Sequence, residues 1–199
     1  MFIVFEGGEG SGKSTQAKAL RRQLLKLGLS VVFTHEPGGT NLGNRLRRWI
    51  KWNGEITSQT ELLLILAARS QLVTEVIRPA LERGSVVVCD RYAYSTIAYQ
   101  GYGRGMDLGL LGPLNKFVTG DLLPELVVLL DVDPEEGLKR KSGGRDRFEK
   151  EELAFHKRVR EGYLKMAAAE PERWLVVNAS LAQKKVQEQV WERVQRLLG

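Results

Sequence analysis

Hydrophobic residues along this chain fall into short continuous runs, separated by longer stretches with helical periodicity. Five runs rich in Val, Leu and Ile predict strands near Phe2–Glu6, Ser30–Thr34, Ser85–Cys89, Leu126–Asp131 and Trp174–Val177. Their continuous apolar character is typical of a parallel sheet that is covered on both faces. Because strand-like and helix-like stretches alternate, the sequence predicts an α/β fold with a parallel five-stranded sheet and helices on both faces.

Helices are expected in the intervals between these strands. The first runs from Lys13 to about Leu27 and ends at Gly28, a suitable C-cap. A long helix begins near Ser58, which forms a capping-box pattern with Glu61, and Pro79 is expected to bend or divide it. The remaining predicted helices are Asn41–Trp52, Leu108–Val118, Pro134–Lys141, Lys150–Ala169 and Leu181–Leu198. The glycine-rich segment Ser95–Gly105 predicts a shaped loop rather than a packed element.

Composition predicts one globular domain spanning residues 1–199. The chain is 43% hydrophobic and 27% charged, values that are ordinary for such a domain. No apolar run approaches the roughly 20 residues that a membrane span requires. Cys89 is the one cysteine, which excludes an internal disulfide and a cysteine-based metal cluster. It lies in an apolar strand and is expected to be a buried, inert thiol, so a cytoplasmic location fits.

The net charge of +6 suggests an anionic partner. Nucleic acid is one candidate, but the basic residues are spread along the chain and are not interleaved with aromatic residues as a stacking surface requires. A highly phosphorylated small substrate explains the charge equally well. Charge alone does not decide between the two.

The segment Gly7-Gly-Glu-Gly-Ser-Gly-Lys-Ser14 carries the clearest chemistry. It matches the pattern G-x-x-x-x-G-K-[ST] between a strand and a helix, which is the context that a phosphate-binding loop (P-loop) requires. Its glycines allow backbone N–H groups to surround phosphate oxygens, and the following helix directs its positive end at them. Lys13 is suited to bridge the terminal phosphates, and the Ser14 hydroxyl is suited to bind Mg²⁺. The sequence therefore predicts a nucleoside-triphosphate site. The residues assigned to it are Gly7, Gly8, Glu9, Gly10, Ser11, Gly12, Lys13, Ser14 and Thr15.

Two other strand ends carry candidate site residues. Asp90 ends the third strand, where P-loop enzymes place a carboxylate linked to magnesium, and Arg91 beside it offers a planar cation suited to phosphate. Asp133 is instead expected to cap a helix. The segment His35–Thr40 follows the second strand; Pro37 and the next glycine favour a tight turn, while the position at a strand end favours ligand binding. Both interpretations of this segment remain open.

A lid is predicted at about residues 139–150. This stretch joins two helices and combines mobile glycines with the cations Arg140, Lys141, Arg145 and Arg147. Closure of such a lid would bring positive charge onto a transferring phosphoryl group and exclude water.

Taken in order, the motifs resemble those of bacterial thymidylate kinases over nearly the whole chain. The matching pieces are the Phe-Glu-Gly P-loop, Glu36–Thr40, Leu46-Arg47, Ala67–Gln71, Asp90–Tyr92, Ser95-Thr96, Ala98–Gly101, Gly103–Gly105, Leu130-Asp131 and Asp146–Glu149. The resemblance implies a P-loop NTPase fold of the nucleoside monophosphate kinase type. It also implies transfer of a phosphoryl group from ATP–Mg²⁺ to dTMP, giving dTDP and ADP, by a homodimer.

The resemblance also implies roles for individual residues. Glu9 is expected to contact the deoxyribose hydroxyl, Arg47 and Arg91 the monophosphate, and Arg69 the thymine edge. The expected substrate-binding residues are Glu9, Glu36, Pro37, Arg47, Ile65, Arg69, Arg91, Ser95 and Gln100. Lys13, Asp90, Arg91 and Arg145 are the expected catalytic residues, and Ser14 and Asp90 the expected metal ligands. Some family members carry an arginine in the P-loop, and the resemblance implies that members without it supply the catalytic cation from the lid. This chain has Gly10 there, so Arg145 is expected to act, with Arg140, Lys141 and Arg147 as alternatives.

Two positions depart from the family pattern. Ile65 replaces an aromatic residue that stacks on thymine, and His35 replaces an arginine. The strictness for thymine is therefore less certain from sequence than the reaction type. A kinase for another small nucleoside or monophosphate is the nearest alternative. A nucleic-acid-stimulated P-loop ATPase is a further one, although it leaves the segment from Asp90 to Gly105 unexplained.

Overall fold

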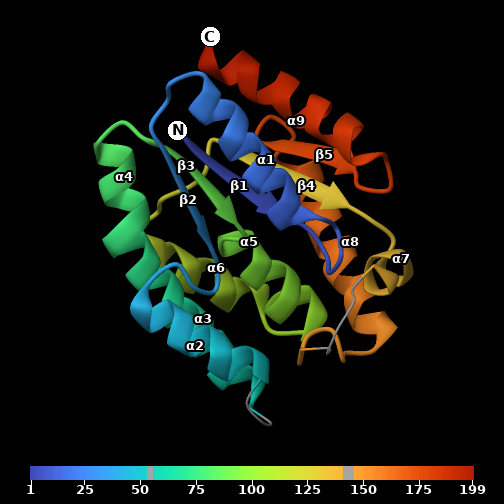
Figure 1. Cartoon of the computed structure of the whole chain (residues 1–199). Helices are drawn as coiled ribbons and strands as arrows, with labels where there is room; N and C mark the ends of the chain where they lie inside the picture. Colours follow the sequence, from blue (N-terminus) through green and yellow to red (C-terminus); the bar gives the residue numbers. More distant parts are fainter. Residues whose placement is uncertain (53–55, 141–145) are drawn as a thin grey trace.

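The fold is a five-stranded parallel sheet with helices on both faces, as the sequence predicts. We describe it from a computed structural model that covers residues 1–52, 56–140 and 146–199. The strands are β1 (Phe2–Glu6), β2 (Val31–His35), β3 (Val86–Asp90), β4 (Leu126–Asp131) and β5 (Trp174–Asn178). They lie in the order β2-β3-β1-β4-β5, and every pairing is parallel. The central strand β1 therefore delivers the P-loop to the middle of the sheet's carboxyl edge (Figure 1).

Helices cover each face of the sheet because alternate strand residues point in opposite directions. From β1, Ile3 and Phe5 pack with α1 (Lys13–Lys26) and α9 (Gln183–Leu198). Phe2 and Val4 face the other way, towards the long helix after residue 57. The second face is completed by α6 (Leu108–Thr119) and α8 (Leu153–Ala169); two further helices are α2 (Asn41–Trp52) and α7 (Pro134–Lys139).

The long helix after residue 57 differs from its prediction at its start and in its middle. Thr57, not Ser58, is the N-cap, and its side chain accepts a hydrogen bond from the Thr60 N–H group. The capping-box prediction is therefore wrong, and Glu61 is buried instead of reaching back to the backbone. The helix runs as α3 (Ser58–Leu72), a π-helical segment η1 (Val73–Ile77) and α4 (Arg78–Glu82). Pro79 lies in the first turn of α4, where its missing N–H is tolerated.

The segment predicted to be a glycine-rich loop is helical. It forms α5 (Ala93–Thr96) and a π-helical segment η2 (Ile97–Gly103), which packs against α8. A Cβ atom on Gly101 would lie 2.4 Å from Leu108, and one on Gly103 would lie 2.5 Å from Phe155. The glycines therefore permit close helix packing here, and the loop prediction is wrong.

Candidate active site

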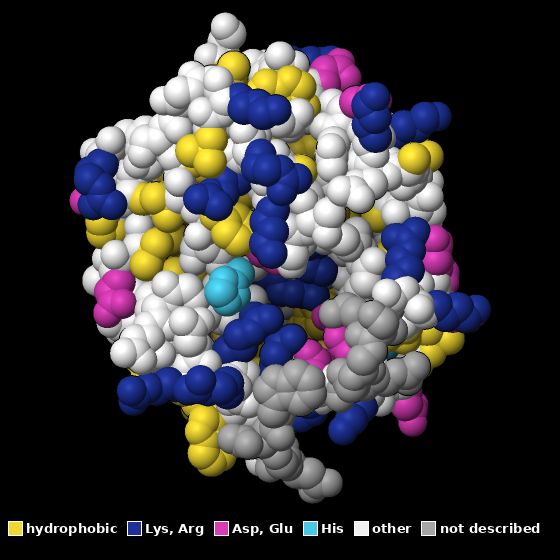
Figure 2. Space-filling model, viewed as in Figure 1, with side chains coloured by type: hydrophobic (Ala, Val, Ile, Leu, Met, Phe, Trp, Pro, Cys, Tyr) yellow, Lys and Arg dark blue, Asp and Glu magenta, His cyan; other side chains and the backbone are white. Residues whose placement is uncertain are grey.

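A cavity of about 580 Å³ lies at the carboxyl edge of the sheet and brings together most of the predicted site residues. This is where open α/β sheets bind ligands. Figure 2 shows Lys and Arg side chains gathered around a hollow on this face. The predicted residues that line the cavity are Glu9, Gly10, Gly12, Lys13, Ser14, Thr15, Glu36, Pro37, Arg47, Ile65, Arg69, Asp90, Arg91, Ser95 and Gln100. Gly7, Gly8 and Ser11 belong to the same loop but do not line the cavity.

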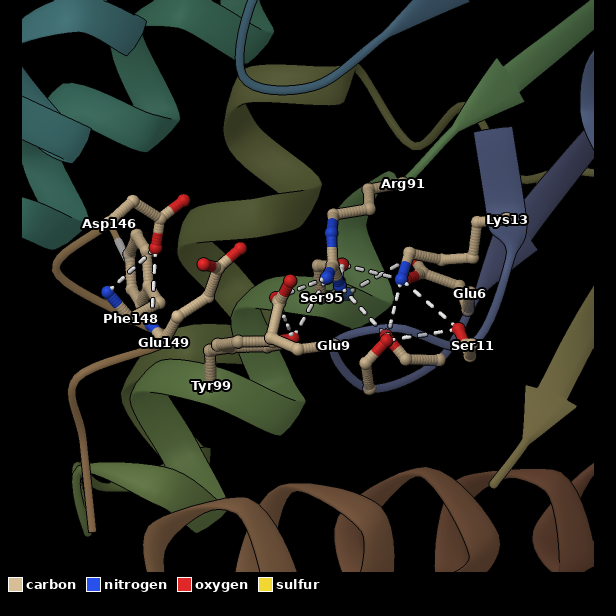
Figure 3. A network of polar contacts seen from close by, with 12 residues as sticks. Glu6, Glu9, Ser11, Lys13, Arg91, Ser95, Tyr99, Asp146, Phe148 and Glu149 are labelled. Carbon is tan, nitrogen blue, oxygen red and sulfur yellow. Dashed lines mark hydrogen bonds and ion pairs between the residues drawn. The ribbon is translucent and has the colours of Figure 1, made fainter. Parts of the chain in front are cut away.

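Lys13 is the first residue of α1, and its ammonium group lies over the P-loop. Nζ donates to the Gly8 carbonyl at 2.7 Å and lies 3.2 Å from the Ser11 hydroxyl (Figure 3). Burial, together with the positive charge of Arg91, lowers the pKa of Lys13 to about 8. A bound phosphate would favour the protonated form of Lys13 and raise its pKa again. The ammonium group is therefore stabilised most when phosphate oxygens are bound in the loop.

Gly10 has a steric reason to lack a side chain. Its φ is +67°, and a Cβ atom there would lie 1.8 Å from the carbonyl oxygen of Gly137 in α7. The contact is equally close from the other side: a Cβ atom on Gly137 would lie 2.3 Å from the Glu9 carbonyl oxygen. Asp133 caps α7 as predicted, accepting from the Glu135 N–H group at 2.9 Å. The P-loop therefore packs directly on the first turns of α7.

The donor set for a divalent cation is a hydroxyl and a carboxylate. The Ser14 hydroxyl donates to Oδ2 of Asp90, so the two predicted ligands are adjacent. Within the described residues, no group of three or more His, Cys, Asp or Glu could hold a metal ion. Mg²⁺ suits such a sparse oxygen set, because it keeps several waters and takes its other ligands from substrate phosphates.

Arg91 occupies the centre of the site and is held from several sides. Its φ is +73°, in the left-handed region that a non-glycine residue rarely adopts. The guanidinium pairs with Glu9 at 2.7 Å and donates to the Tyr99 hydroxyl at 2.8 Å and the Gly7 carbonyl at 3.0 Å (Figure 3). This arrangement fixes a permanent cation beside the P-loop.

Glu6 holds the turn that carries Arg91, and it is not among the site residues predicted from the sequence. The carboxylate is completely buried, and Oε1 accepts from the N–H groups of Tyr92 at 2.9 Å and Ser95 at 3.2 Å. Oε2 accepts from the hydroxyls of Ser95 at 2.6 Å and Tyr163 at 2.8 Å. Burial raises the pKa of Glu6, although Arg91 acts in the opposite direction. A charged residue at the end of an apolar strand was the available sequence signal.

The first three residues of the segment His35–Thr40 line the cavity, which favours the ligand-binding interpretation over that of a simple turn. Glu36 and Pro37, joined by a cis peptide bond, both face the cavity. Arg47 donates to the Pro37 carbonyl at 2.9 Å. Gly38 has a φ of +143°, beyond the value that a type II turn requires at this position.

Arg69 forms part of the cavity wall, but protein acceptors already engage its guanidinium. Nε donates to Glu36 at 2.7 Å, and the same carboxylate lies 2.6 Å from Nη2. Thr96 and Asn115 each accept from Nη1 at 2.7 Å, and Nη2 also donates to the Tyr92 carbonyl at 3.0 Å. Burial raises the pKa of Glu36 to about 7, against the effect of Arg69. A base contact by Arg69 would have to share one of these donors.

Several lining residues were not assigned from sequence. They are Lys18, Phe33, Lys51, Thr96, Tyr99, Asp146 and Phe148. Tyr99 and Phe148 meet edge to face, with ring centroids 5.7 Å apart, so aromatic surface reaches the cavity although Ile65 is aliphatic. The Ala98–Gly101 motif was the available signal for Tyr99; nothing in the sequence marks Phe33.

His35 lies near several cations, which supply positive charge at a position where the family pattern has an arginine. Burial lowers its pKa, and the charges of Arg47, Lys18 and Lys51 act in the same direction. The carboxylate of Asp90 acts in the opposite direction, so His35 lies in a mainly cationic part of the cavity.

The described part of the predicted lid lies against the protein. Residues 141–145, which include Lys141 and Arg145, lie outside the described residues. Arg140 donates to the Ala179 carbonyl at 2.9 Å, and Arg147 binds Glu61 and the Ile50 carbonyl. Neither of these two arginines lines the cavity. Asp146, in contrast, lines it and pairs with Lys51 of α2 at 2.5 Å.

Comparison of the sequence with known proteins matches the chain to one family. A sequence model described as thymidylate kinase matches residues 5–190. The chain belongs to the thymidylate kinase family. The thymidylate kinase of Dehalococcoides mccartyi (strain CBDB1) is 51% identical over 202 residues, covering 100% of this chain and 97% of its own. That of Deinococcus radiodurans is 49% identical, covering 98% and 96%.

A solved structure supports the same conclusion for the fold. The crystal structure of thymidylate kinase from Ehrlichia chaffeensis has a TM-score of 0.83 and 34% sequence identity, and the match covers 98% of each chain. The predicted resemblance and the predicted P-loop NTPase fold are therefore confirmed. No helix among the described residues is long and apolar enough to cross a membrane. Cys89 is buried with a raised pKa, as expected of an inert thiol.

Proposed function

We propose that this enzyme transfers the γ-phosphoryl group of ATP to dTMP, giving dTDP and ADP. Its membership of the thymidylate kinase family supports this reaction. The observation that carries it is that a single cavity joins the P-loop cation Lys13 to a wall formed by Ile65 and Gln100. Arg91 lines the same cavity, and in this proposal it binds the monophosphate of a pyrimidine nucleoside.

Four residues carry the chemistry in this proposal. Lys13 and the glycine N–H groups bind the donor phosphates, and Arg91 and Arg47 hold the acceptor phosphate. Fixed cations on both sides bring two anionic substrates together and stabilise the charge on the phosphoryl group as it transfers. Glu9 pairs with Arg91 and lines the same cavity, and in this proposal it contacts the acceptor sugar.

Ser14 and Asp90 would hold Mg²⁺ in the proposed reaction. The ion would neutralise charge on the donor phosphates. The adjacent hydroxyl and carboxylate support this assignment, since they are hard oxygen ligands at the mouth of the P-loop. Arg145 remains the proposed lid cation, within a lid of about residues 139–150 on a single domain of residues 1–199.

The positive charge of the chain supports a small phosphorylated substrate better than nucleic acid. Lys13, Lys18, Arg47, Lys51 and Arg91 all line the cavity. Such a concentration of positive charge in one cavity suits substrates that carry several phosphates. An ATPase stimulated by DNA or RNA is consequently not favoured.

Transfer from γ-labelled ATP to added dTMP tests the proposal. We expect labelled dTDP to form only when ATP, Mg²⁺ and dTMP are all present, and Lys13→Met to abolish it. Hydrolysis of ATP without an acceptor, stimulated by added DNA or RNA, would instead favour the ATPase alternative.

We also propose that the enzyme is a cytoplasmic homodimer. Leu63 of α3 is 62% exposed, and Leu110 and Phe117 of α6 are 49% and 83% exposed. Leu110 and Phe117 are seven residues apart and share one helix face, and α3 packs against α6. A second copy of the chain would bury this surface. The location is proposed because the single cysteine is buried and unpaired.

Light scattering after size exclusion tests the dimer. We expect the mass of a dimer for the wild type and that of a monomer for Phe117→Glu. Leu27→Glu is the matched control, because Leu27 is 57% exposed at the end of α1, on the other face of the sheet. Equal masses for all three proteins would contradict the proposed interface.

A further inference from the structure

Glu61 is a buried carboxylate that the proposed chemistry does not use. It lies in the first turn of α3 and is completely inaccessible to solvent. Carboxylates are almost never fully buried unless they are paired, because loss of hydration is costly. Its burial therefore requires an explanation in terms of its partners.

Three side chains converge on this carboxylate. Oε1 accepts from Nε2 of Gln100 at 2.7 Å and from Nε of Arg104 at 3.4 Å. Oε2 accepts from Nη2 of Arg104 at 3.1 Å and from Arg147. The two arginines offset the buried negative charge. The contact with Gln100 is not needed for that, so it points to a second role.

The carboxylate fixes which way the Gln100 amide faces. An ionised carboxylate can only accept hydrogen bonds, so the NH₂ group of Gln100 must be the one directed at Glu61. Gln100 is 1% exposed and lines the cavity. Among the described residues no group donates to its Oε1, and this oxygen is not fully buried. The acceptor oxygen of Gln100 is therefore the atom left for a ligand.

A fixed acceptor at this wall discriminates between pyrimidines. Thymine and uracil carry a ring N3–H donor, whereas cytosine has a bare N3 acceptor in the same position. An acceptor facing an acceptor leaves two desolvated lone pairs without a proton, which is unfavourable. A freely rotating amide could avoid this cost by presenting its NH₂ group to cytosine instead.

We propose that Glu61 is a positioning residue for specificity: it locks the Gln100 amide so that its oxygen faces the base and selects pyrimidine monophosphates that carry N3–H. This inference rests on the proposed function, because it assumes that the base occupies the end of the cavity at Ile65 and Gln100. Glu61 acts through Gln100 and does not itself line the cavity.

Glu61→Gln is the decisive variant, since a neutral amide can pair with Gln100 in either orientation. We expect the ratio of kcat/KM for dTMP to that for dCMP to fall about tenfold or more, from the loss of one enforced buried hydrogen-bond pattern. The ratio for dTMP to dUMP should stay unchanged, because both bases carry N3–H. A purely structural role would lower kcat/KM for all three acceptors together and would leave both ratios unchanged.

Glu151→Gln is the matched control. Glu151 pairs with the same Arg104, at 2.5 Å, but the Gln100 amide donates to Glu61 and not to Glu151. The same chemical substitution there should leave the dTMP to dCMP ratio at the wild-type value. Glu61→Asp keeps the negative charge that the arginines offset, but its shorter side chain no longer reaches Gln100. It should therefore also lower the ratio, and it tests the inference even if Glu61→Gln fails to fold.

A double-mutant cycle tests whether Glu61 acts through Gln100. Gln100→Ala should lower the dTMP to dCMP ratio, and adding Glu61→Gln should lower it no further. Additive effects, or equal losses for dTMP and dCMP in Glu61→Gln, would overturn the inference. A wild-type enzyme that prefers a purine acceptor would contradict the proposed function itself, which is a different result from a wild type that selects dTMP without help from Glu61.

Discussion

Replacement of Gly10 by alanine tests whether the P-loop is packed on α7. The left-handed backbone at φ +67° costs an L-residue about 1–2 kcal/mol. The added Cβ would also lie 1.8 Å from a backbone oxygen of α7, an atom that cannot rotate away. Overpacking of this kind costs about 1–3 kcal/mol more. We therefore expect Gly10→Ala to lower the free energy of unfolding by about 2–5 kcal/mol.

Two other P-loop glycines separate the two contributions. Gly12 has a φ of +86° but nothing within 4 Å of a built Cβ, so Gly12→Ala should show only the backbone cost of about 1–2 kcal/mol. Gly8 has neither a neighbour within 4 Å nor a left-handed φ, so Gly8→Ala should stay within about 0.5 kcal/mol of the wild type. The expected order of destabilisation is Gly10, then Gly12, then Gly8.

Thermal unfolding measures this series directly. For a chain of this size each kcal/mol shifts Tm by about 2–4 °C, so the three variants should be well resolved. If Gly10→Ala and Gly12→Ala were equally destabilised, the contact with Gly137 would contribute nothing. The steric reason for the absence of an arginine at position 10 would then be refuted.

Four further outcomes follow from the site. Lys13→Met should abolish transfer without changing the far-ultraviolet circular dichroism spectrum, because the methionine fills the buried volume but lacks the charge. In the wild type, kcat/KM for ATP should fall as pH rises above about 8, since burial and Arg91 lower the pKa of Lys13 to about 8 and only its charged form binds phosphate; Lys13→Arg should remove this alkaline limb from the pH profile. Glu6→Gln should raise KM for dTMP and lower stability by about 1–3 kcal/mol in urea titrations, because an amide cannot accept all four hydrogen bonds that hold the Arg91 turn. Asp90→Asn should raise the Mg²⁺ concentration needed for half-maximal rate with little change in the melting temperature measured without nucleotide.

The strands were predictable because their apolar runs are continuous. β1 and β4 have the predicted bounds, β2 and β3 are each shifted by one residue towards the C-terminus, and β5 extends one residue further than predicted. Helix α2 also has its predicted bounds. A strand buried on both faces is decided by local composition, so no tertiary information is needed to find it.

The errors arose where tertiary packing decides the local structure. Gly101 and Gly103 suggested a loop, but they allow η2 to pack closely against neighbouring side chains. Glu61 suggested a capping box, but it is buried and contacts three side chains that lie far from it in the sequence.

The site residues also divide into those set by local sequence and those set by tertiary packing. The P-loop and Asp90-Arg91 were found because their chemistry is local to a motif. Glu6 and Glu61 were missed, since a buried carboxylate cannot be told from a surface one until its partners are known.

Turnover of a panel of monophosphates with ATP–Mg²⁺ tests the central claim most directly. dTMP, dUMP, dCMP, dAMP and dGMP would be compared by kcat/KM in a coupled assay for ADP. The proposed acceptor site predicts the highest value for dTMP, a lower but measurable value for dUMP, and far lower values for dCMP and both purines. Equal or greater turnover of a purine monophosphate would contradict it.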